Sequence, residues 1–556
     1  MRKLFFLFII TSAMLFAGCR HPVEDIVLCV QLDPLQKVFT EESFFEENAD
    51  TAAVAKGETA TFQFVIKSSF PIRDLKIEAG NLKKDDRQIV ASLKAFIKYV
   101  RAGNHAGTRS KDAVFPISDY YPDCLLEVES IDVPAMQNQP VWISYAIPRD
   151  MENGNYAGTL AFTGTINGKS FKLIKEVNVN VYPVILPEQT LWMTIWYRPN
   201  LLSQMNGNEP VEPYSDRYWE LLGAMARAMR DHGQNTYIIR GHKVFSWDGL
   251  CKFERTGLQY SFDFTNFDKT VEVFIREGGL KRIEGNHLSW RMRDWNGEFG
   301  ISMPDDRIQT ELITVPNVPT KPFENDTARV FLSQFLTALY SHLEDKGWKD
   351  MYIQHVADEP VEQNAESYAR IAEYVKKYMP GIPIIDAVET SKLANTVDIW
   401  VPLLSHYHRS YAFYQERKAA GDETWFYTCV GPQGNYANRF MEQPLIQTRF
   451  LHWINYRYGA TGYLHWGFNA WLPDNPYPAG DAWISYPAEG RVYSSIRLEA
   501  LRDGIADYEL LKLLEQNDPE KAKELAGVVI KNFDSYDNNI RRFRQTRLKL
   551  LSCLSE

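Results

Sequence analysis

The feature that most constrains the fold is a change of hydrophobic pattern about one third of the way along the chain. From Asp25 to about Pro187, apolar and polar residues alternate in stretches such as "TATFQFVIKSS", "QPVWISYAIP", "NYAGTLAFTGTI" and "FKLIKEVNVNVYPV". This alternation, broken by turns such as "ENGN" and "INGK", predicts many strands without helices. We therefore predict an antiparallel β-sandwich over residues 19–187.

The pattern changes after the proline-flanked stretch "PVILPEQT", where strands begin to alternate with helices such as "SYARIAEYVKKYM". The eight strand candidates are "LWMTIWY", "NTYIIR", "KRIEGNHL", "MYIQHVADE", "IPIIDAVE", "VDIWVPLL", "TWFYTCV" and "TGYLHWGF". Eight β/α repeats predict a (β/α)8 TIM barrel over residues 188–515, with a doubly wound sheet as the alternative. Residues 516–556 read as a C-terminal helical tail. The predicted class is multidomain, with β and α/β parts.

The chain starts with "MRKLFFLFIITSAMLFAGC", in which basic Arg2 and Lys3 precede an apolar run from Leu4 to Ala17. This run predicts a signal peptide over residues 1–18 rather than a transmembrane span. Its end, "LFAGC", resembles a bacterial lipobox, which implies cleavage before Cys19 and lipidation of its thiol. The alternative is a plain signal peptide with an incidental cysteine. We expect an exported lipoprotein of the outer membrane, on its periplasmic or cell-surface side, held by the lipid anchor alone.

Composition narrows the possible partners. The formal net charge is -10 and no dense Lys/Arg block is present, which argues against nucleic acid. The cysteines form no CxxC pair, so a structural zinc site is not expected. "SHYHRS" contains His406 and His408, which would share a face if they lay on a strand, but no third ligand is nearby. We predict no metal and no cofactor, and we leave the oligomeric state open.

The stretch "YIQHVADEPVE" ends an apolar run with two adjacent acids, Asp358 and Glu359, followed by Pro360. In the barrel interpretation they end the fourth strand, and TIM-barrel chemistry lies at the C-terminal ends of the strands. The alternative is a helix cap: Pro360 suits the first position of a following helix, and acids there complement the helix dipole. Capping explains one acid better than two.

Most glycoside hydrolases use two carboxyl groups, one as the acid and one as the nucleophile or base. The seventh strand, "TWFYTCVGPQGNY", supplies no acid at its end: Glu423 precedes it, and the next acid is Glu442. A 2-acetamido group on the sugar can replace the missing nucleophile by forming an oxazolinium intermediate. We assign Glu359 as the general acid/base and Asp358 as the residue that polarises the acetamido group, because repulsion between neighbours separates their pKa values.

Two rival hypotheses remain open. One is a conventional glycosidase that uses Glu389 or Asp386 of the fifth strand as the partner carboxylate and cleaves sugars without a 2-acetamido group. The other is a glycan-binding lipoprotein without catalytic activity.

Four stretches in order, "ADEP", "WFYTCVGPQGNYAN", "YLHWGFNAW" and "SIRLEALRDGIADYELL", together resemble glycoside hydrolase family 123. With the exported sandwich, the resemblance covers nearly the whole mature chain. It implies a retaining exo-β-N-acetylgalactosaminidase that acts on glycolipid or related glycans through an oxazoline. The adjacent Asp and Glu of the family map onto Asp358 and Glu359.

Other residues are candidates for holding a carbohydrate substrate with a terminal 2-acetamido sugar. Tyr427 is the first choice as hydroxyl donor to the acetamido oxygen, and Tyr407 is the second. The remaining candidates are Trp466, Trp471 and Trp196 for the apolar sugar face, and Asn469, Asn438, Asn286 and His287 for hydroxyl groups. Core packing and loop hydrogen bonds are the competing uses of these side chains. The charged residues of the fourth stretch are expected to form structural salt bridges: Arg497, Glu499, Arg502, Asp503 and Asp507.

Overall fold

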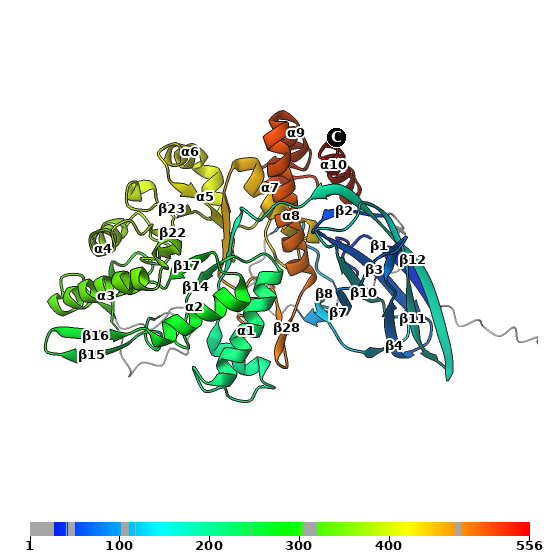
Figure 1. Ribbon diagram of the computed structural model, residues 1–556, viewed down its shortest axis with the longest axis horizontal. Helices are drawn as coiled ribbons and strands as arrows, with labels where there is room; N and C mark the ends of the chain where they lie inside the picture. Colours follow the sequence, from blue (N-terminus) through cyan, green and yellow to red (C-terminus); the bar gives the residue numbers. More distant parts are fainter. Residues whose placement is uncertain are drawn as a thin grey trace, which may run out of the picture.

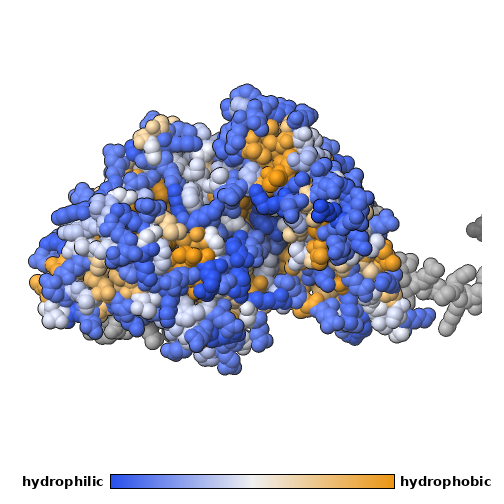
Figure 2. Space-filling view, viewed as in Figure 1, coloured by the Kyte–Doolittle hydropathy of each residue, from blue (hydrophilic) through white to orange (hydrophobic). Residues whose placement is uncertain are grey.

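The computed structural model describes residues 27–40, 42, 51–101, 110–116, 118–244, 246–303, 320–472 and 480–556. The predicted signal peptide and Cys19 lie outside the described residues. Within those ranges, no helix has the length and apolar character needed to span a membrane. Figure 1 shows a β-rich lobe beside a lobe of alternating strands and helices, with the C-terminal helices near the junction. The face drawn in Figure 2 is largely hydrophilic, with hydrophobic residues gathered in smaller areas.

The N-terminal lobe is built from two sheets. The first has the order β1 (Val27–Leu32), β3 (Thr59–Ser68), β10 (Gln139–Ala146), β7 (Leu93–Arg101) and β8 (Tyr120–Leu126). The second has the order β2 (Ala52–Lys56), β12 (Lys169–Ile185), β11 (Gly154–Ile166), β4 (Ile72–Ala79) and β9 (Ser130–Val133), with β5 (Leu82–Lys84) and β6 (Arg87–Ile89) attached. Phe64 of the first sheet and Phe162 of the second are both fully buried, with ring centroids 5.4 Å apart. The sheets therefore enclose one core. Among the described sandwich strands the pairing is antiparallel, as predicted, except for the parallel pairing of β12 with β2.

Each predicted strand of the second lobe contains an observed one, shorter than predicted. Within the described residues these are β13 (Trp192–Ile195), β14 (Thr236–Ile238), β17 (Arg282–Gly285), β21 (Tyr352–Gln354), β22 (Ile385–Ala387), β23 (Ile399–Val401), β24 (Glu423–Thr424) with β25 (Phe426–Tyr427), and β26 (Gly462–His465). Parallel ladders join β14 to β17, β17 to β21, β22 to β23, β23 to β24, β25 to β26 and β26 to β13. Single parallel bridges link Gln354 to Ile384 and Leu403 to Tyr427. The last strand pairs with the first, which is the order of neighbours expected for a (β/α)8 barrel.

Helices cover these strands and form the C-terminal region. They are α1 (Asp216–Asp231), α2 (Thr265–Gly278), α3 (Asp326–Asp345), α4 (Ala365–Tyr378), α5 (Leu404–Arg409), α6 (Tyr411–Ala419), α7 (Leu445–Tyr458), α8 (Ile496–Asn517), α9 (Pro519–Val529) and α10 (Ile540–Cys553). Short polar residues begin several of them: the Ser495 side chain, for example, accepts the N–H of Leu498 at the start of α8. His406 and His408 lie on α5 and not on a strand, so the condition for a shared face is not met, because residues two apart on a helix do not face each other.

The shorter extended and 3-10 segments complete the chain. They are η1 (Pro199–Met205), β15 (Lys252–Thr256), β16 (Gln259–Asp263), β18 (Ser289–Arg291), β19 (Phe299–Ser302), β20 (Thr320–Lys321), η2 (Lys349–Met351), η3 (Ser391–Leu393), β27 (Tyr486–Ala488), β28 (Arg491–Tyr493), β29 (Ile530–Asn532) and β30 (Ser535–Tyr536).

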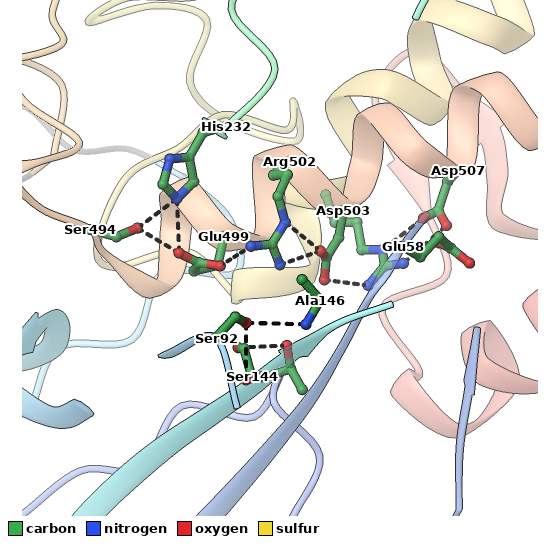
Figure 3. A network of polar contacts seen from close by, with 12 residues as sticks. Glu58, Ser92, Ser144, Ala146, His232, Ser494, Glu499, Arg502, Asp503 and Asp507 are labelled. Atoms are coloured by element: carbon green, nitrogen blue, oxygen red, sulfur yellow. Dashed lines mark hydrogen bonds and ion pairs between the residues drawn. The ribbon is translucent and has the colours of Figure 1, made fainter. Parts of the chain in front are cut away.

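Charged residues of α8 lie in a polar network that reaches the sandwich (Figure 3). Glu499 is ion-paired with Arg502, and Asp507 accepts from Arg547 of α10 at 2.7 Å. Arg547 also pairs with Glu58, which lies between β2 and β3 of the sandwich. The predicted salt bridges are present, and they attach α8 to the sandwich as well as to the neighbouring helices.

Candidate active site

The acid pair lies in the loop that follows β21. Asp358 and Glu359 come after the last paired residue of the strand, and α4 begins only at Ala365. The helix-cap alternative requires a helix that starts at Pro360, so this explanation of the pair is wrong. Glu359 has φ of 47°, in the left-handed region, which costs a non-glycine residue on the order of 1–3 kcal/mol. Arg291 donates to the Glu359 carbonyl and helps to hold this conformation.

Glu359 is set up to carry a proton at neutral pH. Tyr427 of β25 donates a hydrogen bond to its Oε1 atom. Burial raises the pKa of Glu359 to about 8; the charge of Asp358 acts in the same direction, and the hydrogen bond from Tyr427 opposes both. A carboxylic acid that is still protonated near pH 7 can donate its proton to a leaving group.

Asp358 has a different electrostatic environment. Burial raises its pKa, but the positive charges of Arg291, Arg240 and His355 act against burial. Glu359, by contrast, has the negative charges of Asp358 and Glu389 among its neighbours. The pKa of Asp358 is raised on balance, but its positive neighbours make it easier to ionise than Glu359, whose neighbours include the negative charges of Asp358 and Glu389.

A buried histidine lies directly behind the pair. His355 contacts Asp386 through Nδ1 at 2.8 Å and Glu284 through Nε2 at 3.0 Å. Burial lowers its pKa, but the hydrogen bonds to the two carboxylates outweigh burial and raise the pKa to about 9. Asp386 also accepts the backbone N–H groups of Val356 at 2.9 Å and Ala357 at 3.3 Å. Asp386 of β22 thus holds the backbone that follows β21, directly before Asp358 and Glu359.

These contacts rule out Asp386 as a nucleophile. It is fully buried, and Tyr368 donates to one of its oxygens in addition to the groups already described. His287, His355 and Asp386 have possible ligand atoms within 4.8 Å of one another. An imidazolium that donates from both ring nitrogens has no lone pair for a metal. The cluster therefore suits a proton on His355 rather than a metal ion.

Aromatic rings cover one side of this cluster. Trp196 follows β13, donates from its indole nitrogen to Glu284 at 3.0 Å, and packs edge-on against His287 and His355 at 5.5 Å. The Arg240 guanidinium lies 4.5 Å from a Trp196 ring centroid. His287 is buried, and neither of its ring nitrogens has a hydrogen-bond partner within the described residues. Two predicted sugar contacts, Trp196 and His287, are thus brought beside the acid pair.

Trp466 follows β26 and contacts Asp481. Its side chain is half-buried, and its indole N–H is shared between the two carboxylate oxygens of Asp481 at 3.2 Å each. Burial raises the pKa of Asp481 to about 7. Burial also raises the pKa of the Cys429 thiol, and the charges of Glu359 and Asp481 act in the same direction. Cys429 therefore interacts with both Glu359 and Asp481.

Four predicted polar contacts have their polar atoms bonded within the protein, and they do not serve as sugar ligands. The Tyr407 hydroxyl donates to the Tyr458 carbonyl, Asn438 to the carbonyls of residues 429, 431 and 432, Asn469 to the Arg198 carbonyl, and Asn286 to the carbonyls of residues 244 and 246. Each braces a loop or the strand wall, which is the competing use of such residues. The Trp471 indole donates to the Ser485 carbonyl, so its role as an apolar sugar contact stays a prediction.

Several site residues were not predicted from the sequence. Arg240 ends the second predicted strand, and Glu284 and His355 lie within the third and fourth. A polar residue near the end of an apolar strand is the signal that could have identified them, as it identified Asp358 and Glu359. Arg291 lies in the insertion after the third strand and carries no such signal.

The chemistry of the site and the fold together define the class of protein. Two adjacent carboxyl groups, of which Glu359 has a pKa raised to about 8, suit cleavage of a bond between sugars. The protein is a glycoside hydrolase.

Comparison with protein families gives the particular family. Residues 196–514 match the model for "Glycoside hydrolase 123, catalytic domain", and residues 39–164 match that for "Glycoside hydrolase 123 N-terminal domain". The chain therefore belongs to glycoside hydrolase family 123, as its motifs suggested.

A solved structure of the same family shares the fold. A family 123 glycoside hydrolase from Clostridium perfringens, described for glycolipid glycan hydrolysis, is 18% identical, covers 95% of this chain and 97% of its own, and has a TM-score of 0.71. An exo-β-N-acetylglucosaminidase of family GH20 from Vibrio harveyi is 9% identical over 89% of this chain and 99% of its own, with a TM-score of 0.29. The latter score is too low to support a conclusion. A comparison with curated protein sequences gives no match.

Proposed function

We propose that the protein is a retaining exo-β-N-acetylgalactosaminidase that acts on glycans or glycolipids by substrate-assisted catalysis. In this proposal the ring of parallel strands is a (β/α)8 barrel whose C-terminal strand ends carry the site. The observation that carries it is the adjacent pair itself: Asp358 and Glu359 follow β21, Tyr427 donates to Glu359, and positive groups surround Asp358. In this proposal Asp358 is the carboxylate and Glu359 is the carboxylic acid. One acid and one orienting carboxylate are what a substrate with its own nucleophile requires.

The steps follow from the two protonation states. Glu359 donates its proton to the glycosidic oxygen while the acetamido carbonyl oxygen attacks the anomeric carbon, which breaks the glycosidic bond and forms an oxazolinium ion. The Asp358 carboxylate accepts the acetamido N–H and stabilises the positive charge that develops. Glu359, now ionised, removes a proton from a water molecule that attacks the anomeric carbon and opens the oxazolinium ring. Because the anomeric carbon is attacked twice, from opposite sides, its configuration is retained. Tyr427, which donates to Glu359 in the free protein, is close enough to donate to the acetamido oxygen in the complex.

The substrate class comes from relatives. The Clostridium perfringens enzyme of the same family is described for glycolipid glycan hydrolysis, which supports a glycolipid or a related glycan as the substrate here. The indole rings of Trp196 and Trp466 are our candidates for the apolar face of the terminal sugar.

A conventional two-carboxylate mechanism is the second candidate, because Glu389 lies close to the pair. Its backbone N–H donates to the Pro360 carbonyl at 3.2 Å. Burial raises the pKa of Glu389, the Arg291 charge opposes this rise, and Asp358 adds to it. A nucleophile must be ionised, so this environment suits Glu389 less well than it suits an acid.

Hydrolysis of three nitrophenyl glycosides tests these candidates: β-N-acetylgalactosaminide, β-N-acetylglucosaminide and β-galactoside. We expect cleavage of acetamido sugars alone, and a loss of about a hundredfold or more in kcat for Glu359→Gln and Asp358→Asn. Glu389→Gln is the matched control and should lose much less. Cleavage of the galactoside that depends on Glu389 would establish the conventional mechanism. Binding of all three sugars without turnover would leave a glycan-binding lipoprotein.

We also propose that the protein is exported and anchored in the outer membrane through a lipid on Cys19. The basic start, the apolar run and "LFAGC" support this location. Metabolic labelling with a radioactive fatty acid tests it: Cys19→Ser should abolish incorporation of the label.

A further inference from the structure

The sandwich contacts the catalytic lobe through the edge strand of its first sheet. β8 continues into this contact: Cys124 forms an antiparallel bridge with Ser495, and the Leu125 N–H donates to the Ser494 carbonyl at 2.9 Å. Asp123 precedes these residues and is 1% exposed. An ionised carboxylate in such a place requires a buried partner.

Arg497 of α8 is that partner, and all of its donors are used. Its Nε and Nη2 atoms donate to the two carboxylate oxygens of Asp123, each at 2.8 Å. Nη2 also donates to the carbonyl of Trp483 at 3.1 Å, and Nη1 donates to those of Arg439 at 3.0 Å and Gly480 at 2.9 Å. A guanidinium has five N–H groups in a fixed plane, so the position of Asp123 determines where these three carbonyls lie.

The three carbonyls belong to the two loops beside the catalytic acid. Arg439 lies in the loop that follows β25, and Gly480 and Trp483 lie in the segment between β26 and α8. The side chain of Arg439 ties the loops together, because its Nη2 atom donates to the carbonyls of Gly467 and Asp481. The Asp123–Arg497 pair and the Arg439 side chain together fix the backbone on both sides of Asp481.

The next contact joins Asp481 to Trp466, which the proposed function places against the sugar. Asp481 is fully buried and holds the indole N–H of Trp466 with both carboxylate oxygens. The indole nitrogen is the only polar atom of that side chain, so this contact sets the direction of the ring. An unbroken series of contacts thus runs from β8 of the sandwich through Arg497 and Asp481 to Trp466.

We propose that Asp123 is a positioning residue for the sugar pocket: through Arg497 it orients the two loops that hold Trp466 against the substrate. The proposal rests on the proposed function, in which Trp466 covers the terminal sugar. Through Asp123, the sandwich therefore contributes to the geometry of the active site.

Two variants separate this role from general stability. Arg497→Lys keeps a positive charge opposite Asp123 but has three donors in place of five, so it cannot hold both loops. Asp123→Asn keeps the shape of the side chain and removes its charge. The control is Asp33→Asn, which breaks a different ion pair between the sandwich and the C-terminal helices, to Arg544 of α10 at 2.7 and 2.8 Å.

The first measurement is the split between KM and kcat on nitrophenyl β-N-acetylgalactosaminide, with thermal unfolding of each variant. We expect KM to rise about tenfold in Arg497→Lys and Asp123→Asn with a smaller change in kcat, which corresponds to about 1.4 kcal/mol of lost sugar binding. The Asp33→Asn control should lose thermal stability and keep the wild-type KM. Unchanged KM in both test variants, or an equal rise in all three, would overturn the proposal.

The second measurement does not need turnover. Amide hydrogen exchange should become faster across residues 466–472 and 480–485 in Arg497→Lys, and should stay at the wild-type rate there in Asp33→Asn. If wild type fails to cleave acetamido sugars but this difference is present, the proposed function is wrong and the connection to the loops still stands. If exchange in these segments is the same in every variant, the connection itself is refuted.

Discussion

The protonation state of Glu359 predicts where activity is lost at high pH. Burial and the neighbouring Asp358 raise its pKa from 4.5 to about 8. With a pKa of about 8, about nine-tenths of the molecules hold the catalytic proton at pH 7; with a pKa of 4.5, only about 0.3% would. The surroundings of Glu359 therefore increase the competent fraction by roughly 300-fold at pH 7, and kcat/KM should fall as pH rises through about 8.

The fall of kcat/KM at high pH is the alkaline limb of the pH profile, and two substitutions should move this limb in opposite directions. Asp358→Asn removes a negative charge, so ionisation of Glu359 becomes easier and the limb moves to lower pH. Tyr427→Phe removes a hydrogen bond that favours the ionised form, so the limb moves to higher pH. The assay is kcat/KM from about pH 4 to about pH 10, because this ratio reports the pKa values of the free enzyme.

The leaving group provides the check on the assignment. Glu359→Gln should lose about 10²- to 10⁴-fold in kcat/KM on a substrate whose leaving group is a sugar. Its kcat/KM should fall little on a dinitrophenyl glycoside, whose leaving group needs no proton, whereas kcat falls on both substrates because Glu359 is also the base for water. The reasoning fails if wild-type kcat/KM already declines near pH 5, if both variants move the limb the same way, or if Glu359→Gln loses equally in kcat/KM on both substrates.

Three stability measurements test the buried charges. Asp386→Asn should lower the free energy of unfolding in urea by roughly 3–5 kcal/mol, because it leaves His355 without one of its two carboxylates. Between pH 4.5 and about 8 the folded wild type keeps a proton on Glu359 that the unfolded chain releases, so stability should fall as pH rises, and Glu359→Gln should remove this slope. Asp507 behaves in the opposite way: burial raises its pKa, but Arg449 and Arg547 outweigh burial and lower it to about 2, so its contribution should be complete above pH 3.8 and disappear toward pH 2. Urea unfolding of Asp507→Asn should lack that acid-dependent loss.

Much of the fold could be predicted because its signals are local. Alternation marked the sandwich strands, and short apolar runs marked the parallel strands of the catalytic lobe. The boundaries were too long, because apolar character continues after backbone pairing stops: β21 ends at Gln354, although "HVA" is buried as well. For the same reason, Asp358 and Glu359 end the predicted strand but lie in the loop after β21 in the structure.

The surroundings of the acid pair could not be predicted in this way. Which side chains meet His355 depends on the register of three adjacent strands, which no single stretch contains. Asn438 and Asn469 looked like sugar ligands, because an amide that closes a loop and an amide that binds a hydroxyl look the same in a sequence. Asp123 and Arg497 are 374 positions apart, so no local pattern connects them.

The shared ionic contacts between the lobes limit how this family can change by recombination. A catalytic lobe joined to a foreign partner would bury Arg497 without Asp123, and would leave Arg547 with Asp507 but without Glu58. An uncompensated buried charge costs about 3–5 kcal/mol, which is a large part of the total stability of an ordinary domain. Exchange of the N-terminal lobe is therefore expected to succeed only when the donor supplies carboxylates at both places, so the two lobes should be inherited together rather than shuffled as independent modules.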